Sequence, residues 1–221
     1  MNNFQKMGGV SALIEAATFV VGIGLAVSLL APYQTGDLDP AQKAAFLVDN
    51  QTVMYLWNNI IYLVFGVFLV VLALALFDRL KDSSPALVQI ATVYGLIWAG
   101  LMFASGMVFN IGLDTVVDLF STDPDQAATI WLAVGSVWDG LGGGNEIVGG
   151  LWVLLLSWAA LRGGGLPRAL NYLGLLIGVA GIITIVPAVE VLGFVFGLGS
   201  IVWFVWLGIV MLRSSPTTAA A

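Results

Sequence analysis

The chain has 221 residues, of which 60% are hydrophobic and only 9% are charged. Soluble domains carry about 25% charged residues, so this composition excludes a water-soluble globule and predicts that the bilayer is the solvent. With no Cys and no His, the chain has no disulfide, iron–sulfur cluster, His-ligated haem or zinc, or Ser-His or Cys-His catalytic pair. We expect no cofactor, and the net charge of −6 argues against nucleic acid as a partner.

Six apolar stretches predict membrane-spanning helices, because about 17–25 such residues cross a bilayer. In chain order they cover residues 8–31, 53–77, 86–113, 145–161, 169–186 and 193–212. The first stretch follows Lys6 and resembles a secretory signal, but we expect it to remain as an anchor. The predicted fold is an all-α membrane protein with six transmembrane helices in a single domain over residues 1–221.

The positive charges predict the orientation of these helices. Cytoplasmic segments carry an excess of Lys and Arg, and one side of the predicted membrane topology holds six of the seven positive residues. These are Lys6, Arg79, Lys81, Arg162, Arg168 and Arg213, with only Lys43 on the other side. We therefore expect a bacterial inner-membrane protein with both termini in the cytoplasm and most acidic residues outside.

A short motif occurs in two of the outer connections. Residues 39–45 read DPAQKAA and residues 123–129 read DPDQAAT. Asp followed by Pro favours a helix start, with Asp as N-cap and Pro in the first turn. Weaker matches on both sides of the motif predict a repeated helical hairpin over residues 8–82 and 86–165, followed by a final hairpin over residues 169–213. The alternative is chance similarity between apolar segments.

Both motifs are predicted to open short amphipathic helices in the outer loops. In the first, Ala41, Ala44, Ala45 and Val48 form an apolar stripe at helical spacing. The second carries a bulkier stripe that includes Trp131 and Trp138. We expect these helices to lie at the outer membrane surface or to cap the bundle. Elsewhere, the Gly174/Gly178 and Gly193/Gly197 spacings predict closely packed helix faces.

Two long segments of the chain resemble a known family. They read DPAQKAAFLVDN…LALALFDRL and GGLWVLLLSWAALRGGGLPRALNYLGLLIGVAGI, and they are similar to a family of uncharacterised bacterial six-span integral membrane proteins, classified as a domain of unknown function. The resemblance covers most of the chain and implies an all-helical bacterial membrane protein. It implies no activity, so it assigns no role to any residue.

Polar side chains inside the spans are the candidate site residues, because each is costly in hydrocarbon. Glu146 follows a run of Gly between residues 140 and 144, which predicts unwound backbone, and such backbone is tolerated where it lines a wet cavity. The predicted polar cluster, open to the outside, comprises Asn58, Asn59, Asn110, Asp139, Asn145 and Glu146. Its alternative role is to hold helices together by hydrogen bonds.

A second candidate is Glu15, which lies alone in the first span. In a structural role it would pair with Lys6 or an inner Arg, or be protonated and donate to a neighbouring carbonyl. The alternative is a role in binding a proton or a ligand. Asp139 and Glu146 would lie about 10 Å apart on an intact helix, which argues against their acting as an acid–base pair. We assign no catalytic residue and no metal ligand.

Three functions fit these features. The first is the binding or passage of a small ligand, cation or lipid through an outward-facing polar cavity. The second is a non-catalytic accessory subunit that docks on a partner membrane subunit, or on a second copy of this chain as a homo-oligomer. The third is a membrane-embedded enzyme that acts on a lipid.

Overall fold

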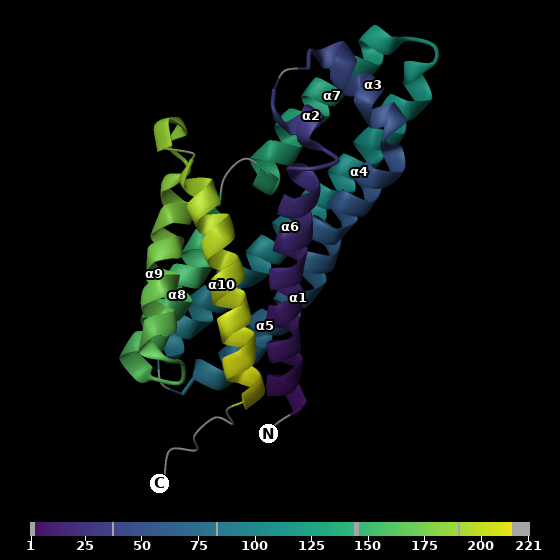
Figure 1. The fold of residues 1–221 in the computed structure, drawn as a ribbon. Helices are drawn as coiled ribbons and strands as arrows, with labels where there is room; N and C mark the ends of the chain where they lie inside the picture. Colours follow the sequence, from purple (N-terminus) through teal and green to yellow (C-terminus); the bar gives the residue numbers. More distant parts are fainter. Residues whose placement is uncertain (1–2, 37, 83, 144–145, 190, 214–221) are drawn as a thin grey trace. The chain divides into compact units, whose positions relative to one another are not determined.

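The computed structural model describes residues 3–36, 38–82, 84–143, 146–189 and 191–213, which are helical apart from short connections and contain no strand (Figure 1). The candidate residue Asn145 lies outside these ranges. The α-helices are α1 (Asn3–Ala26), α2 (Ala31–Gln34), α3 (Pro40–Asp49), α4 (Gln51–Asn58), α5 (Phe65–Leu80), α6 (Pro85–Phe120), α7 (Pro124–Trp138), α8 (Ile147–Gly163), α9 (Arg168–Ile183) and α10 (Leu192–Arg213). Two π-helical segments, η1 (Asn59–Val64) and η2 (Asp139–Gly143), and the short 3-10 helix η3 (Pro187–Val189) complete the described elements.

Five helical stretches are long and apolar enough to cross a membrane. They are Asn3–Ala26, Gln51–Leu80, Pro85–Phe120, Pro124–Gly163 and Leu192–Arg213. The remaining predicted span forms α9, whose 16 residues extend about 24 Å at 1.5 Å per residue. That length is less than the roughly 30 Å of the hydrocarbon core, and α9 therefore falls among the shorter apolar helices.

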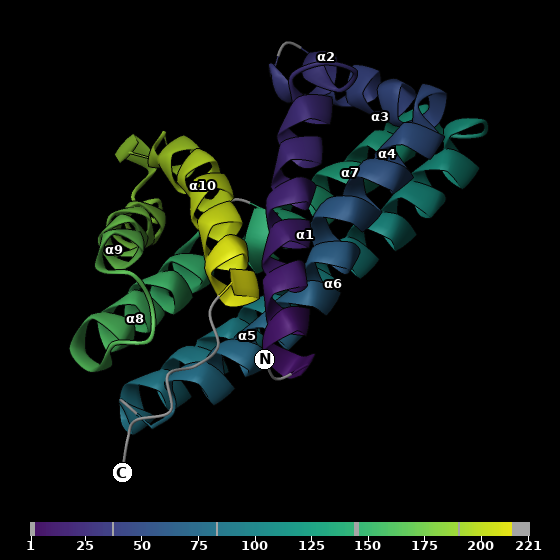
Figure 2. The same ribbon diagram turned by 60° about the horizontal axis from the view of Figure 1, so that its bottom comes forward.

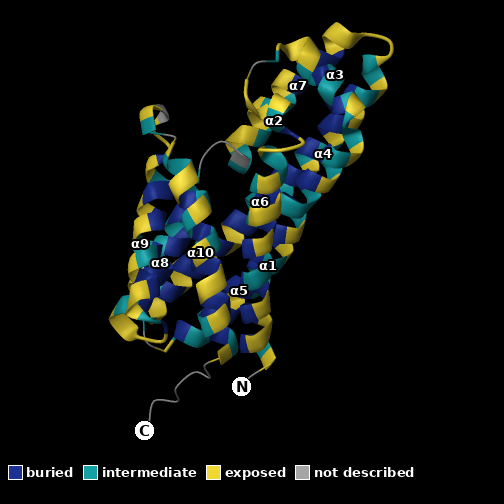
Figure 3. Cartoon of the chain, viewed as in Figure 1, coloured by how far each residue is buried: buried dark blue, intermediate teal, exposed yellow. Residues whose placement is uncertain are grey.

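The exposed surface confirms that the chain is a multi-pass membrane protein. On α10, Phe194 is 72% exposed and Leu198 is 55% exposed, and on α9, Leu176 is 62% exposed. Large apolar side chains thus occupy exposed positions on these helices, where a soluble protein would place charges. Figure 3 shows how exposed and buried positions alternate along the helices. Lipid is the solvent that suits such a surface.

The contacts divide the chain into two compact units. Unit 1 contains Met1–Phe19, Phe65–Gly100 and Asn145–Ala221. Unit 2 contains Val20–Val64 and Leu101–Gly144. Because α1 and α6 are continuous helices, each of them contributes a segment to both units.

In unit 1, α8 and α9 pack backbone to backbone (Figure 2). A Cβ atom on Gly150 would lie 2.7 Å from the carbonyl oxygen of Gly178, and one on Gly178 would lie 2.8 Å from that of Gly150. The close approach predicted at Gly178 is therefore confirmed. The same prediction is wrong for Gly193 and Gly197, where the nearest atoms would be 3.9 and 4.0 Å away, an ordinary contact that needs no glycine.

Aromatic rings fill the rest of the interior of unit 1. The rings of Phe65 and Trp98 meet edge to face at 4.9 Å, and those of Trp152 and Trp203 at 5.7 Å. The ring of Phe204 packs against Trp152 of α8 at 6.3 Å and against its own neighbour Trp203 at 5.3 Å. Such edge-to-face pairs contribute about 0.5–1.5 kcal/mol each beyond the area they bury.

In unit 2, both predicted N-caps are confirmed. Asp39 accepts a hydrogen bond from the backbone N–H of Gln42 at 2.8 Å, and the Gln42 side chain accepts one from the N–H of Asp39 at 2.9 Å. Asp123 likewise caps α7 by accepting a hydrogen bond from the N–H of Gln126 at 3.0 Å. The two Asp-Pro sequences therefore start helices as expected.

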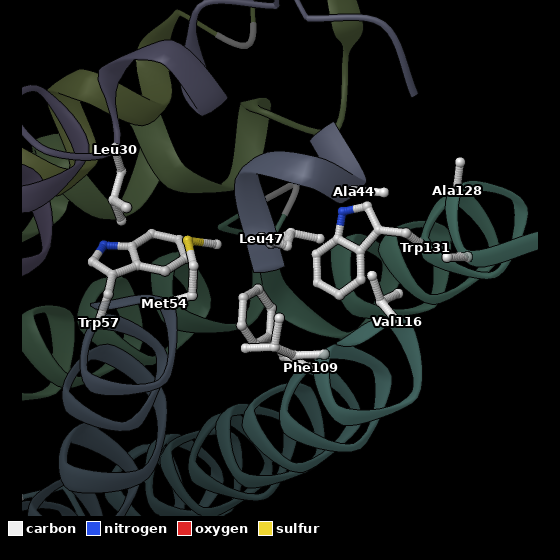
Figure 4. Packing of buried hydrophobic residues seen from close by; sticks show 11 residues of the cluster. Leu30, Ala44, Leu47, Met54, Trp57, Phe109, Val116, Ala128 and Trp131 are labelled. Carbon is white, nitrogen blue, oxygen red and sulfur yellow. The ribbon is translucent and has the colours of Figure 1, made fainter. Parts of the chain in front are cut away.

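The helices α3 and α7 that follow these caps lie side by side and cover the core of unit 2 (Figure 1). Leu47 and Trp131 lie near Phe109 in this core (Figure 4), and the Phe109 and Trp131 rings meet edge to face at 5.2 Å. The buried stripe of α3 consists of Ala44 and Leu47, whereas Ala41 is exposed. The predicted stripe was therefore wrong at Ala41, because α3 buries only the narrow face that meets α7.

The backbone breaks in the Gly-rich segment, as the sequence predicts. The segment η2 follows α7 directly, and inside it Gly142 adopts φ 157° and ψ 12°, which is not helical. A residue with a Cβ rarely adopts that conformation. The regular helix resumes only at Ile147.

We predict that Gly150→Ala destabilises the protein. The new methyl group would meet the backbone of α9, and overpacking of this kind costs about 1–3 kcal/mol. The matched control is Gly100→Ala on α6, where a Cβ would meet nothing within 4 Å and the change favours the helix by up to about 1 kcal/mol. Thermal unfolding in detergent should show a lower midpoint for Gly150→Ala alone, and equal midpoints for the two variants would contradict the close packing.

Candidate functional site

Three of the predicted site residues form a hydrogen-bonded network in unit 2, which we call the asparagine network. The side-chain amide of Asn58 donates to the side-chain oxygen of Asn110 at 2.9 Å and to the carbonyl oxygen of Gly106 at 2.9 Å. The amide of Asn110 in turn donates to the side-chain oxygen of Asn59 at 2.8 Å. The network thus joins the end of α4 and the start of η1 to α6.

A glycine and a change of helix type make this network possible. A Cβ on Gly106 would lie 2.8 Å from Leu63 and 2.9 Å from Tyr62, so η1 approaches α6 only because residue 106 is glycine. The π-helical segment starts at Asn59, directly after Asn58. Single π-helical turns inside α-helices occur frequently at functional sites, and this one turns two adjacent asparagines toward the same helix.

The asparagine network contains a buried acceptor without a partner. The Asn58 side chain is fully buried, and its carbonyl oxygen accepts no hydrogen bond from any described residue. An unsatisfied buried polar atom costs about 1–3 kcal/mol. Within this network the Asn58 oxygen is the buried acceptor that no described residue satisfies.

A buried donor without a partner lies in the same unit. The indole N–H of Trp138 has no acceptor among the described residues. The Trp138 ring packs against Tyr62 at 5.7 Å, Phe109 at 5.5 Å and Trp57 at 6.2 Å. Those three residues border the asparagine network in sequence, so the unpaired donor belongs to the same region of unit 2 as the unpaired acceptor.

Two further polar residues extend the network, and the sequence analysis missed their role. The Tyr55 hydroxyl donates to the backbone carbonyl oxygen of Asn110 at 3.4 Å and makes a short hydrogen bond to the carboxylate of Asp114. Tyr55 precedes Asn58 by three residues, and Asp114 follows Asn110 by four. Residues at these spacings share a helix face, so the sequence alone could have placed Tyr55 on the face of Asn58 and Asp114 on the face of Asn110.

Glu146 and Asp139 occupy different units. Glu146 is half-buried at the N-cap of α8, where its backbone N–H donates to the Thr184 hydroxyl at 3.0 Å. Asp139 is exposed at the start of η2. Every partner described for the asparagine network belongs to unit 2, whereas Glu146 belongs to unit 1, so a joint cluster of these residues remains a prediction.

Asp139 acts on Tyr33, a half-buried tyrosine in the connection between α1 and α3. The Trp131 indole donates to the Tyr33 hydroxyl at 2.8 Å, which links α7 to α2. Burial raises the pKa of Tyr33 from 10.0 to about 12, because the phenolate loses its hydration. The hydrogen bond from Trp131 lowers the pKa, and the negative charge of Asp139 raises it further. Tyr33 is therefore a neutral hydroxyl at physiological pH.

Glu15, the remaining candidate, lies in the part of α1 that belongs to unit 1. Its side chain is fully buried, and neither carboxyl oxygen has a hydrogen-bond partner among the described residues. The Thr18 hydroxyl donates to the backbone carbonyl oxygen of Glu15 at 2.8 Å and leaves the carboxyl group untouched. No ion pair joins Glu15 to Lys6 or to an inner Arg in the described part of the chain.

Comparison with known proteins identifies the family. The model of the family described as Domain of unknown function (DUF4386) matches residues 7–210. The chain belongs to this family. The resemblance inferred from the sequence is thereby confirmed, and membership brings no established activity to any residue. No curated protein and no solved structure matches the chain.

We predict that Asn58→Ala destabilises the protein by about 1–3 kcal/mol, because the Asn110 oxygen loses its buried donor. Asn50→Ala is the control, since the Asn50 side chain donates only to the Phe46 carbonyl one turn earlier, and changes outside such networks usually stay within about 0.5 kcal/mol. Denaturant or thermal unfolding in detergent measures both. A loss for Asn58→Ala no larger than that for Asn50→Ala would show that the network contributes nothing to stability.

Proposed function

We propose that this chain is a six-span protein of a bacterial inner membrane that binds a small polar ligand from the outside at the asparagine network. The observation that carries this proposal is the fully buried side-chain oxygen of Asn58, which accepts no hydrogen bond from the described residues. A ligand that donates a hydrogen bond there would remove the cost of the unpaired atom.

The chemistry of the two unpaired atoms favours a neutral, hydroxyl-bearing ligand. The Asn58 oxygen needs a donor, and the Trp138 indole N–H needs an acceptor. A hydroxyl group both donates and accepts, so the hydroxyls of a polyol or of a lipid headgroup suit both atoms. A metal cation suits them less, because hard cations take six or more oxygen ligands and no cluster of three acidic residues occurs in the described part of the chain.

Binding explains this arrangement better than helix association does. Asparagines that only hold helices together contribute about 0.6 kcal/mol on average and need no unpaired oxygen. Here the hydrogen bonds that the Asn58 amide donates fix its side chain, whereas its side-chain oxygen accepts none from a described residue. A preorganised group of this kind binds with less loss of side-chain freedom.

The caps and π-helical segments support the proposed hairpin repeat. The helices α3 and α7 both begin with Asp-Pro and a capping hydrogen bond. Each of these connections leads into a π-helical segment, η1 after α4 and η2 after α7. In a repeat of two-span hairpins both connections lie on the same side of the membrane, which would bring the asparagine network to the outside.

We predict that a thiol in the asparagine network reacts with a charged, membrane-impermeant methanethiosulfonate added from outside. The chain has no Cys, so Asn59→Cys carries a single reporter at a half-buried position of the network. A water-accessible site lets the thiol ionise and react, because the thiolate is the nucleophile.

The matched control is Ile111→Cys on α6, beside Asn110, where the side chain is 67% exposed and, in the proposed span, would face lipid. We expect modification of Asn59→Cys and none of Ile111→Cys. If neither variant reacts while both retain the wild-type thermal midpoint, the network is dry and serves only to join helices.

A further inference from the structure

We propose that Glu15 is an exchangeable proton-binding site inside unit 1, separate from the ligand site proposed in unit 2. The proposal rests on the position of Glu15 in the packing of α1, on the absence of partners for its carboxyl group among the described residues, and on the apolar character of the segments that face it.

Contacts on both sides of Glu15 hold α1 against α5 and α10. Toward the N-terminus, a Cβ on Gly8 would lie 2.5 Å from that of Ala75 on α5, and one on Gly9 would lie 3.1 Å from the backbone of Gly208 on α10. Toward the C-terminus, the Phe19 ring packs on Phe65 of α5 at 5.7 Å and on Phe204 of α10 at 6.1 Å. Glu15 lies between these two levels, so its side chain has no room to leave the interior.

The facing segments offer the carboxyl group neither charge nor hydrogen bond. Residues 65–75 of α5 and 204–211 of α10 are apolar throughout. One turn earlier on α10, the buried hydroxyl of Ser200 makes no hydrogen bond to a described residue. The charged groups of the three helices lie near their ends, namely Lys6 on α1, Asp78 and Arg79 on α5, and Arg213 on α10. Lys6 and Arg213 are exposed, and Arg79 donates to the Gly165 carbonyl and to the Gln5 side chain.

The other helices of unit 1 also supply no counter-charge to Glu15. The α6 segment up to Gly100 has Tyr94 as its one titratable group, and the charges of α8 and α9 are the exposed Arg162 and Arg168 at their cytoplasmic-facing ends. Glu146 adds a second acid rather than a counter-charge. No described residue of unit 1 therefore neutralises Glu15.

An isolated buried carboxylate costs several kcal/mol, so the occupant of this site must remove the charge. A metal ion would need several oxygen ligands, and the surroundings supply one carboxyl group. A proton needs only that group. Because the carboxyl is not fixed by a hydrogen bond to any described residue, the proton is held by desolvation alone and leaves when water reaches the site.

Labelling with a hydrophobic carbodiimide tests this inference. The reagent enters from lipid and adds to a protonated carboxyl group, and proteolysis with mass analysis locates the adduct. In wild-type protein in liposomes we expect an adduct at Glu15 that is lost as the pH is raised. Glu15→Gln should lose this adduct, and Glu146→Gln, the matched control, should keep it.

Two results would overturn the proposal. An adduct elsewhere in the chain with none at Glu15 at any pH would show that the protonated Glu15 carboxyl group never becomes accessible, and it would overturn the exchangeable site. A Glu15 adduct whose yield does not change with pH would show a sealed structural group without proton exchange. Both results come from the wild-type chain, so they hold even if Glu15→Gln fails to fold, and neither bears on the accessibility of Asn59.

Discussion

The hydrocarbon interior of a bilayer supplies no hydrogen-bond partners, and this constraint shapes the whole chain. Every backbone group in the crossing segments must be paired within the protein, which explains why the described residues form helices and no strand. It also explains why the exposed faces of α9 and α10 are apolar. In such surroundings a buried polar atom without a partner is costly, and the two proposed sites are built on atoms of this kind.

The two units hold such atoms in chemically different forms. Unit 2 presents a neutral site, where paired amides position one free oxygen at Asn58 and an indole N–H remains free at Trp138. Unit 1 presents an ionisable site at the buried Glu15 carboxyl group, and it also holds neutral unpaired groups such as the Ser200 hydroxyl and the Trp152 and Trp203 indoles. A buried neutral polar atom without a hydrogen bond costs about 1–3 kcal/mol of stability, and a buried unpaired charge costs several kcal/mol. The unpaired atoms of unit 2 suit a hydroxyl group, and the Glu15 carboxyl group suits a proton.

Local features of the chain were predictable from the sequence because they depend on residues near one another. Asp39 and Asp123 cap helices through bonds within one turn, and the Gly-rich segment breaks at Gly142 because of its own backbone freedom. The asparagine side chains were predicted to cluster because polar groups in a membrane seek one another.

Features that depend on distant partners were not predictable. The Gly174/Gly178 and Gly193/Gly197 pairs have the same spacing, yet close backbone contacts occur only at the first, because spacing does not reveal whether another helix faces the glycines. The unpaired N–H of Trp138 depends on which residues pack around the end of α7. The division of α1 and α6 between two units likewise depends on which distant segments contact each part of these helices. The family has no established function, so it does not supply the missing partners.

The claim that α9 crosses the membrane decides whether the chain has six spans and both termini on one side. If this short helix crosses, all six inner Lys and Arg residues share one side. If it does not, Arg213 lies on the side opposite Arg168. The most direct measurement places single thiols at two exposed positions on either side of α9, Gly163→Cys and Ala188→Cys. We expect an impermeant reagent to label Ala188→Cys in intact cells and Gly163→Cys only after permeabilisation, and labelling of both from the same side would contradict the six-span account.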